Sequence, residues 1–221
     1  MGVFVMVRIS SLLAIAVALV AAPPAAHAQP EDDLAMSTAC PVMPPIGCKA
    51  AVIRKAKIKI KDVTDKPHKD SLSWSFKKGA ATETSEFGDP VGGSPSIAGC
   101  LYDSSARPQP LRELVIAPGG TCNGKPCWTS KNDKFQFKSK VPNADGVVFA
   151  KLISGEGEET QSKILLKAKG ENLMPPLLPL GLPATMMFIV NDGTESCWIV
   201  PYDTFGIDEN SEDMFKAKGP Q

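Results

Sequence analysis

Cysteine is the residue type in this chain that is most informative about chemistry, and the chain contains six. All of them lie downstream of a segment that looks like a secretory leader. An even number of cysteines in an exported protein predicts disulfide bonds, because thiols oxidise and stay oxidised outside the cytosol. The six are Cys40, Cys48, Cys100, Cys122, Cys127 and Cys197.

Spacing suggests one way to pair them, although sequence alone does not select a pairing. Cys40–Cys48 would close a Pro-rich loop, and Cys122–Cys127 would close the short turn CNGKPC. Cys100–Cys197 would then be a long-range bridge that joins two sheets. In the chain-entropy model the longest loop contributes most stability, so we expect loss of Cys100–Cys197 to be the most damaging.

Metal, redox and cofactor chemistry are not expected. The chain has no CxxC pair, and His68 is the only histidine after the leader, whereas zinc sites need closely spaced Cys and His ligands. The spacer between Cys122 and Cys127 is longer than in redox motifs. An acidic segment lacks EF-hand spacing, so a solvated loop is favoured over a calcium site. Its acidic residues are Asp208, Glu209, Glu212 and Asp213.

No catalytic residue is expected either. A serine or cysteine nucleophile would have to use His68 as its base, and no GxSxG motif is present. Glu156, Glu158 and Glu159 could supply the paired carboxylates of a glycosidase. Their glycine-rich surroundings favour a hairpin tip instead.

Two groups of side chains could bind an anionic or neutral glycan. Trp74, Trp128 and Trp198 could stack on sugars, but Trp74 and Trp198 lie in strand-like segments that favour core packing, and Trp128 follows Cys127 and could pack on its disulfide. Rows of lysine could form a basic sheet face; the favoured alternative is that they keep a wet face or an edge from aggregating. These rows contain Lys55, Lys57, Lys59, Lys61, Lys163, Lys167 and Lys169.

The candidate recognition loop lies inside the CNGKPC turn. Asn123, Gly124, Lys125 and Pro126 are held between two cysteines, with Trp128 just beyond them. A loop constrained by a disulfide loses less entropy when it binds a partner. The partner would be a protein or a glycan.

The elements that position these residues begin with the leader. Residues 1–28 are predicted to be a signal peptide that is cleaved after Ala28, which predicts a secreted or periplasmic protein with no stable membrane span after cleavage. Residues 29–50 form a Pro-rich N-terminal segment, and residues 51–221 form the domain. Acidic and basic residues balance at 24 each, and without a basic domain we expect no nucleic-acid partner.

The domain has the alternation of a β protein. Strict period-two patterns at 55–61 and 71–77 predict strands with one wet and one buried face. Residues 174–183 contain too many prolines for a helix or central strand and predict a crossover. We predict one antiparallel β-sandwich, Greek-key or jelly-roll-like, stabilised by disulfides; a barrel or a two-domain break near 104–110 is the alternative. Further strands are expected at 97–103, 111–117, 134–140, 147–153, 163–169, 184–190 and 196–202.

Several motifs together resemble a cysteine-containing β-domain of exported bacterial proteins of unknown function. They are KAKIKIKD, KDSLSWSFKKGAAT, FGDP, CLYD, GGTCNGKPCW, ILLKAKGENL and LPLGLP. The resemblance covers most of residues 48–200. It implies export and a single β-domain, and it brings no catalytic residues.

The leading hypothesis is therefore an exported, non-enzymatic binding or structural β-domain of a bacterial envelope. A carbohydrate-binding or carbohydrate-active protein is one alternative. A protein-binding or inhibitor module that uses the Cys122–Cys127 loop is another.

Overall fold

The computed structural model describes residues 2, 39–93, 95–105, 109–132, 134–155, 162–194 and 196–220. The chain divides into two units, residues 1–35 and 36–221, and the account below concerns the second. The predicted signal peptide, apart from Gly2, and the candidate carboxylates Glu156, Glu158 and Glu159 lie outside the described residues. Within those residues, no helix has the length and apolarity needed to cross a bilayer.

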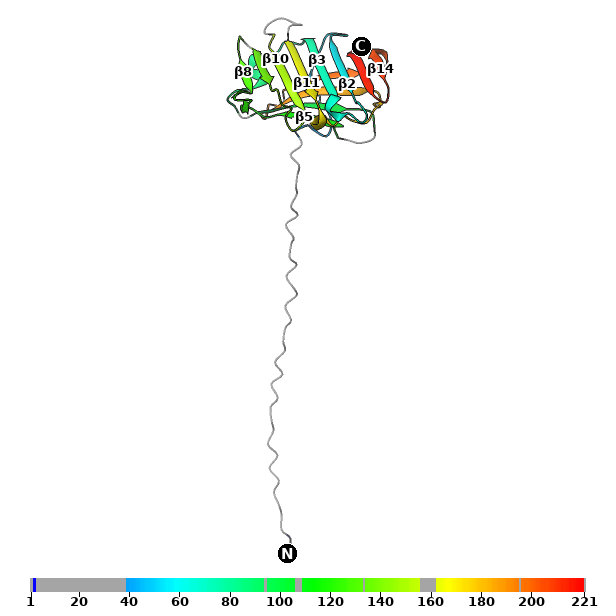
Figure 1. Ribbon diagram of the computed structural model, residues 1–221. Coiled ribbons are helices and arrows are strands. Elements are labelled where there is room, and N and C mark those ends of the chain that lie inside the picture. Colours follow the sequence, from blue (N-terminus) through cyan, green and yellow to red (C-terminus); the bar gives the residue numbers. More distant parts are fainter. Residues whose placement is uncertain are drawn as a thin grey trace. The chain divides into compact units, whose positions relative to one another are not determined.

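The larger sheet has eight strands in the order β14-β15-β2-β3-β11-β10-β9-β8, and Figure 1 shows it running across the domain. All of its pairings are antiparallel. Its strands are β14 (Ile207–Asn210), β15 (Met214–Gly219), β2 (Ala56–Lys61), β3 (Ser71–Gly79), β11 (Ser162–Lys169), β10 (Val147–Ile153), β9 (Lys134–Lys138) and β8 (Trp128–Ser130).

The smaller sheet has five strands in the order β1-β13-β12-β4-β5, and β1 pairs with β13 in parallel. Its strands are β1 (Lys49–Ala50), β13 (Cys197–Tyr202), β12 (Ala184–Asn191), β4 (Ser96–Tyr102) and β5 (Arg112–Ile116). A separate hairpin joins β6 (Thr121–Cys122) to β7 (Lys125–Pro126). Among the described residues, helical structure is limited to the 3-10 turns η1 (Pro67–Lys69), η2 (Thr84–Phe87), η3 (Glu171–Leu173) and η4 (Thr204–Gly206).

The main core lies between the two sheets. Alternate residues of the larger sheet, such as Ile58 and Trp74, face Phe188 and other side chains of the smaller sheet. The Trp74 ring stacks on Phe188 with centroids 6.4 Å apart, and its indole N–H donates a 3.0 Å buried hydrogen bond to the Tyr202 hydroxyl. Burial strongly raises the pKa of Tyr202, so this hydroxyl stays neutral. The expected all-β fold of packed antiparallel sheets stabilised by disulfides is confirmed.

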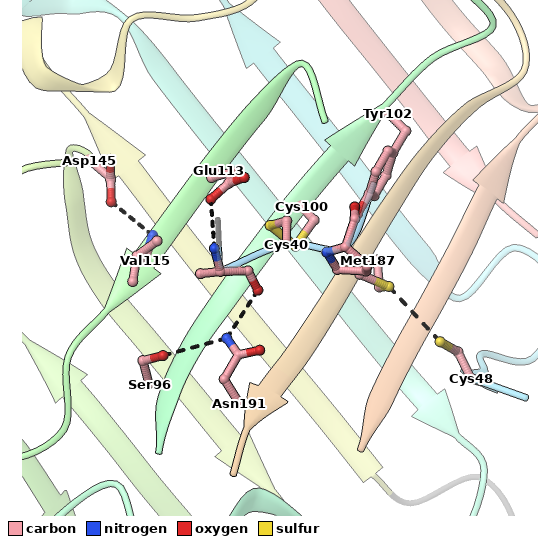
Figure 2. Close-up of a disulfide and its surroundings, with 12 residues drawn as sticks. Cys40, Cys48, Ser96, Cys100, Tyr102, Glu113, Val115, Asp145, Met187 and Asn191 are labelled. Carbon is pink, nitrogen blue, oxygen red and sulfur yellow. Dashed lines mark hydrogen bonds between the residues drawn. A yellow bond between two sulfur atoms is a disulfide. The ribbon is translucent and has the colours of Figure 1, made fainter. Parts of the chain in front are cut away.

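A second, smaller core covers the outer face of the five-stranded sheet. Outward-facing residues of β4 and β12, including Ala98, Met187 and Ile189, are buried there. The covering chain is the Pro-rich segment that ends at Cys48. Ala39 is fixed at both backbone groups: its N–H donates to Glu113 Oε2 at 3.1 Å, and its carbonyl accepts from Asn191 Nδ2 at 3.0 Å (Figure 2). This explains why β4 and β12 are apolar almost without alternation.

All six cysteines are in disulfides, but two of the three expected pairings are wrong. The bonds are Cys40–Cys100, Cys48–Cys197 and Cys122–Cys127, so only the last was expected. The described part of the Pro-rich segment lies across the smaller sheet and is bonded to it at Cys40 and Cys48. Figure 2 shows the Cys40–Cys100 bond and the position of Cys48. Its prolines favour an extended chain, which keeps Cys40 and Cys48 apart.

The register of the smaller sheet excludes the expected Cys100–Cys197 bond. Cys100 and Cys197 both lie in this sheet, with β12 between their strands. Met187 is the partner of Cys100, and Ile189 is the partner of Cys197. Two strand spacings amount to about 9.6 Å, whereas bonded cysteines have Cα atoms no more than about 7 Å apart. Both bridges instead join the sheet to the segment that covers it.

Candidate functional site

The predicted recognition loop is the turn of the β6–β7 hairpin. Asn123 has φ 55° and Gly124 has φ 76°. Positive φ at two successive turn residues is typical of the type I′ turn, which Asn-Gly favours. The Cys122–Cys127 bond closes the hairpin. The turn is also tied to the larger sheet, because the Lys140 N–H donates to Asn123 Oδ1 at 3.1 Å and the Lys138 N–H donates to the Cys127 carbonyl at 2.9 Å.

Four members of the predicted loop are available to a partner, and the fifth is not. Asn123, Gly124, Lys125 and Pro126 are exposed. Trp128 is 1% exposed, donates its indole N–H to the Ala117 carbonyl at 2.9 Å, and has its ring 5.4 Å from that of Phe137. Placing Trp128 in the recognition surface is therefore a mistake of the sequence analysis. Its aromatic ring faces the core because β8 is a strand whose inward position it occupies.

A hollow of about 400 Å³ lies beside this hairpin. Lys125 from the turn and Lys138 and Lys140 from the neighbouring β9 region line it, together with Thr129 and Gln136. No acidic residue is among the lining residues. The hollow therefore offers amine, amide and hydroxyl donors to an anionic group.

The hairpin hollow adjoins a much larger basic surface, the outer face of the eight-stranded sheet, which we call the lysine face. Every strand of this sheet except β14 lacks Asp and Glu. In these strands, every second residue points to the core and the residues between them point outward. On six adjacent strands, from β15 to β9, outward positions carry lysine. These lysines are Lys57, Lys59, Lys61, Lys77, Lys134, Lys138, Lys151, Lys163, Lys167, Lys169, Lys216 and Lys218.

The register places several of these lysines directly opposite one another. Lys59 is the partner of Lys216, and Lys57 is the partner of Lys218. Like charges opposite each other in a sheet are destabilising. Asp208 on β14 relieves part of this repulsion: it accepts a 3.1 Å hydrogen bond from Lys218 Nζ and lies 3.6 Å from Lys216 Nζ. The hydrogen bond from Lys218 is the main cause that lowers the pKa of Asp208.

Within the part of the chain that the structure describes, no salt bridge involves the other lysines of the face. The salt bridges within the described residues involve Lys49, Arg112, Lys216 and Lys218, so none neutralises a lysine of β2 or β11. Strands β2, β3 and β11 are each paired on both sides. The sequence favoured lysines that keep a wet face or an edge from aggregating. The lysines of β2 and β11 do lie on a wet face, but protection of an edge does not account for them. An outer face needs polar residues to be solvated by water, but these residues do not all have to carry positive charge.

The remaining sequence candidates do not assemble into a site. Trp74 and Trp198 are buried, as expected, so neither can stack on a sugar. His68 is exposed in η1. Within the described residues, no group of three His, Cys, Asp or Glu side chains is arranged to hold a metal ion. The sequence analysis did not include the lysines of β9 and β10 in its candidate basic face, although Lys134, Lys138 and Lys151 follow the same alternation as the rows that it singled out.

No family model, no curated protein and no solved structure matches this chain. The resemblance to an exported bacterial β-domain stays a prediction. The structure places this protein among disulfide-bonded, all-β domains of two packed sheets. The larger of its two sheets presents the lysine face.

Proposed function

We propose that this protein is an exported, non-enzymatic binding domain that recognises an anionic ligand on the lysine face. The observation that carries this proposal is that basic residues are concentrated on one sheet face from which acidic residues are nearly absent. The chain has a formal net charge of zero, yet β15, β2, β3, β11, β10 and β9 together contain many lysines and no acid. A patch of one sign produces a local field that concentrates ligands of opposite sign.

Export is supported by the disulfides. All three bonds have Cα–Cα separations between 4.8 and 5.8 Å, and two of them fix the covering segment to the smaller sheet. Bonds of this kind form and persist in oxidising compartments. The predicted leader and the predicted secreted or periplasmic location agree with this chemistry.

A second candidate function is protein recognition by the hairpin. Its support is that Lys125 is exposed at a turn fixed by a disulfide and by hydrogen bonds to the β9 region. A rigid projecting loop binds with a small loss of conformational entropy. Recognition of neutral sugars has weaker support, because Trp74, Trp128 and Trp198 are all in the core.

Ion-exchange chromatography tests the main proposal. The purified protein should be retained at pH 7 on a sulfonate resin at low ionic strength despite its zero net charge, and salt should release it because screening weakens surface electrostatics. A Lys59→Gln/Lys134→Gln variant should elute at lower salt. The control Lys66→Gln/Lys69→Gln removes equal charge from the exposed loop between β2 and β3, outside the strands of the face. Flow-through of the unmodified protein, or equal shifts in both variants, would contradict the proposal.

A further inference from the structure

The lysine face contains a trough that runs along β3. Strand β3 contributes Ser71, Ser73 and Ser75 to this face, whereas the strands on either side, β2 and β11, contribute mainly lysine. Serine is short and lysine is long, so the serines form a floor between two walls of lysine. A hollow of about 410 Å³ lies here, lined by Ser73 and Ser75 and by side chains of both walls. It continues across β2 to Lys216 and Lys218 of β15 and reaches one acidic side chain, Asp208.

The strand register shows how the walls face each other. Ser73 is the partner of Lys59 on one side and of Lys167 on the other. Ser71 is likewise the partner of both Lys61 and Lys169. Lysine positions therefore recur at two-residue intervals, about 6.8 Å of strand, all along β2 and at Lys167 and Lys169 of β11. The two walls are two strand spacings apart, about 9.6 Å. Such a trough fits one extended chain with anionic groups along both of its edges.

One position in the wall is apolar. Leu165 is the partner of Ser75 and lines the same hollow, opposite Lys57. Beside it, Lys167 Nζ lies 5.8 Å from the centre of the Phe149 ring, a contact that helps to fix the ammonium group. The trough thus combines cations, hydroxyls that both donate and accept hydrogen bonds, and a small apolar surface. Acidic sugars present carboxylates, hydroxyls and C–H faces in the same chain.

We infer that the trough along β3 binds a linear acidic polysaccharide, with carboxylate groups on the two lysine walls and sugar hydroxyls on the serine floor. This inference rests on the proposed function and narrows it to one ligand class and one location. The strands of the eight-stranded sheet hold none of the exposed large apolar side chains found in the described residues. Insertion into a lipid surface and base stacking both require such side chains, so a bilayer or single-stranded nucleic acid fits this face less well.

Binding of polygalacturonate, measured by calorimetry, tests the inference. The Lys59→Gln/Lys167→Gln variant removes one lysine from each wall beside Ser73. The matched control, Lys134→Gln/Lys151→Gln, removes two lysines from the same face outside the trough. We expect the first variant to bind about 30-fold more weakly, from the known contribution of single lysines at anionic surfaces, and the control to bind less than about threefold more weakly.

A second variant tests the trough without changing charge. Ser73→Leu fills the floor at an exposed position, so the fold should tolerate it, and thermal unfolding checks that it does. We expect this variant to bind polygalacturonate at least about tenfold more weakly. The leucine side chain between the walls would keep the ligand from reaching one polar contact on each wall.

Each outcome has a defined meaning. Equal weakening in the two lysine variants, with Ser73→Leu unaffected, would overturn the trough but leave the lysine face as the binding surface. Absence of binding to polygalacturonate, to vesicles of phosphatidylglycerol and to an oligonucleotide at low salt would overturn both proposals. Tighter binding to the vesicles or to the oligonucleotide than to polygalacturonate would overturn the polysaccharide and assign the face to that ligand.

Discussion

Removal of the Cys48–Cys197 bond should destabilise the protein more than removal of either other disulfide. The bond joins residues 149 positions apart, compared with 60 for Cys40–Cys100 and 5 for Cys122–Cys127. In the chain-entropy model these loops correspond to about 5, 4 and 2 kcal/mol of stability at 25 °C. The first two loops overlap, so their values are not additive.

The structure gives a second reason for this order. Cys48 leads directly into β1, which pairs with β13 at Lys49 and Ala50. The Ala80 N–H also donates to the Ala50 carbonyl at 3.1 Å, and the next residue, Ala51, forms an isolated bridge with Gly79. Without the bond, this end of the covering segment would depend on these short backbone contacts and on the ion pair between Lys49 and Glu86. Its other end keeps Cys40–Cys100 and the hydrogen bonds of Ala39. The double variant Cys48→Ala/Cys197→Ala should therefore also expose Met187, which lies 4.0 Å, sulfur to sulfur, from Cys48.

Equilibrium unfolding in urea measures these differences directly. Each pair of cysteines is replaced by alanine in a separate variant, and the free energy of unfolding is compared at fixed pH and temperature. The Cys122→Ala/Cys127→Ala variant is the internal control, because its loop is short and lies at the surface. If this control loses as much stability as Cys48→Ala/Cys197→Ala, loop length does not govern the effect and the reasoning fails.

Three further predictions concern other parts of the domain. Tyr202→Phe should cost about 1–3 kcal/mol in urea unfolding, because it leaves the buried indole N–H of Trp74 without an acceptor. Burial raises the pKa of Glu113 above its ordinary value of 4.5, so just above pH 4.5 the folded state binds more protons than the unfolded state. The stability that this group contributes is therefore present at low pH and falls as the pH rises through the folded pKa. Glu113→Gln should remove that fall from the pH profile of the unfolding free energy. Lys59→Glu, placed opposite Lys216, should raise the melting temperature while weakening polygalacturonate binding; a lower melting temperature would contradict the repulsion inferred for this pair.

The sequence predicted most of the larger sheet because its strands have one wet and one buried face. Alternation of lysine with apolar residues placed a strand at 55–61, and alternation of serine with apolar residues placed one at 71–77; the structure has β2 at Ala56–Lys61 and β3 at Ser71–Gly79. The smaller sheet was harder to interpret, since β12 is buried on both faces and shows no alternation. A strand without alternation does not reveal which of its faces a cysteine occupies.

The errors in disulfide pairing have the same origin. The expected pairing treated residues near Cys40 as a local loop and placed Cys100 and Cys197 between sheets. Both errors would have been avoided by asking what covers the outer face of a strand as apolar as β4, in which both faces are buried. The Pro-rich segment was the available cover, and two cysteines at its ends were the means to fix it. Sequence period alone contains no information about this third layer of packing.

The outer faces of the two sheets differ in their contribution to stability, and this difference supports a binding role for the lysine face. The outer face of the smaller sheet is apolar and is closed by a covalently attached segment, so it contributes stability. The outer face of the larger sheet is left open and holds like charges in register, such as Lys77 with Lys163, at a cost to stability. Alternating serine, threonine or mixed charges would solvate that face without repulsion. Proteins retain destabilising surface features where function requires them. An anionic chain bound among these lysines would relieve their mutual repulsion. We propose that this bound state is the functional state of the domain.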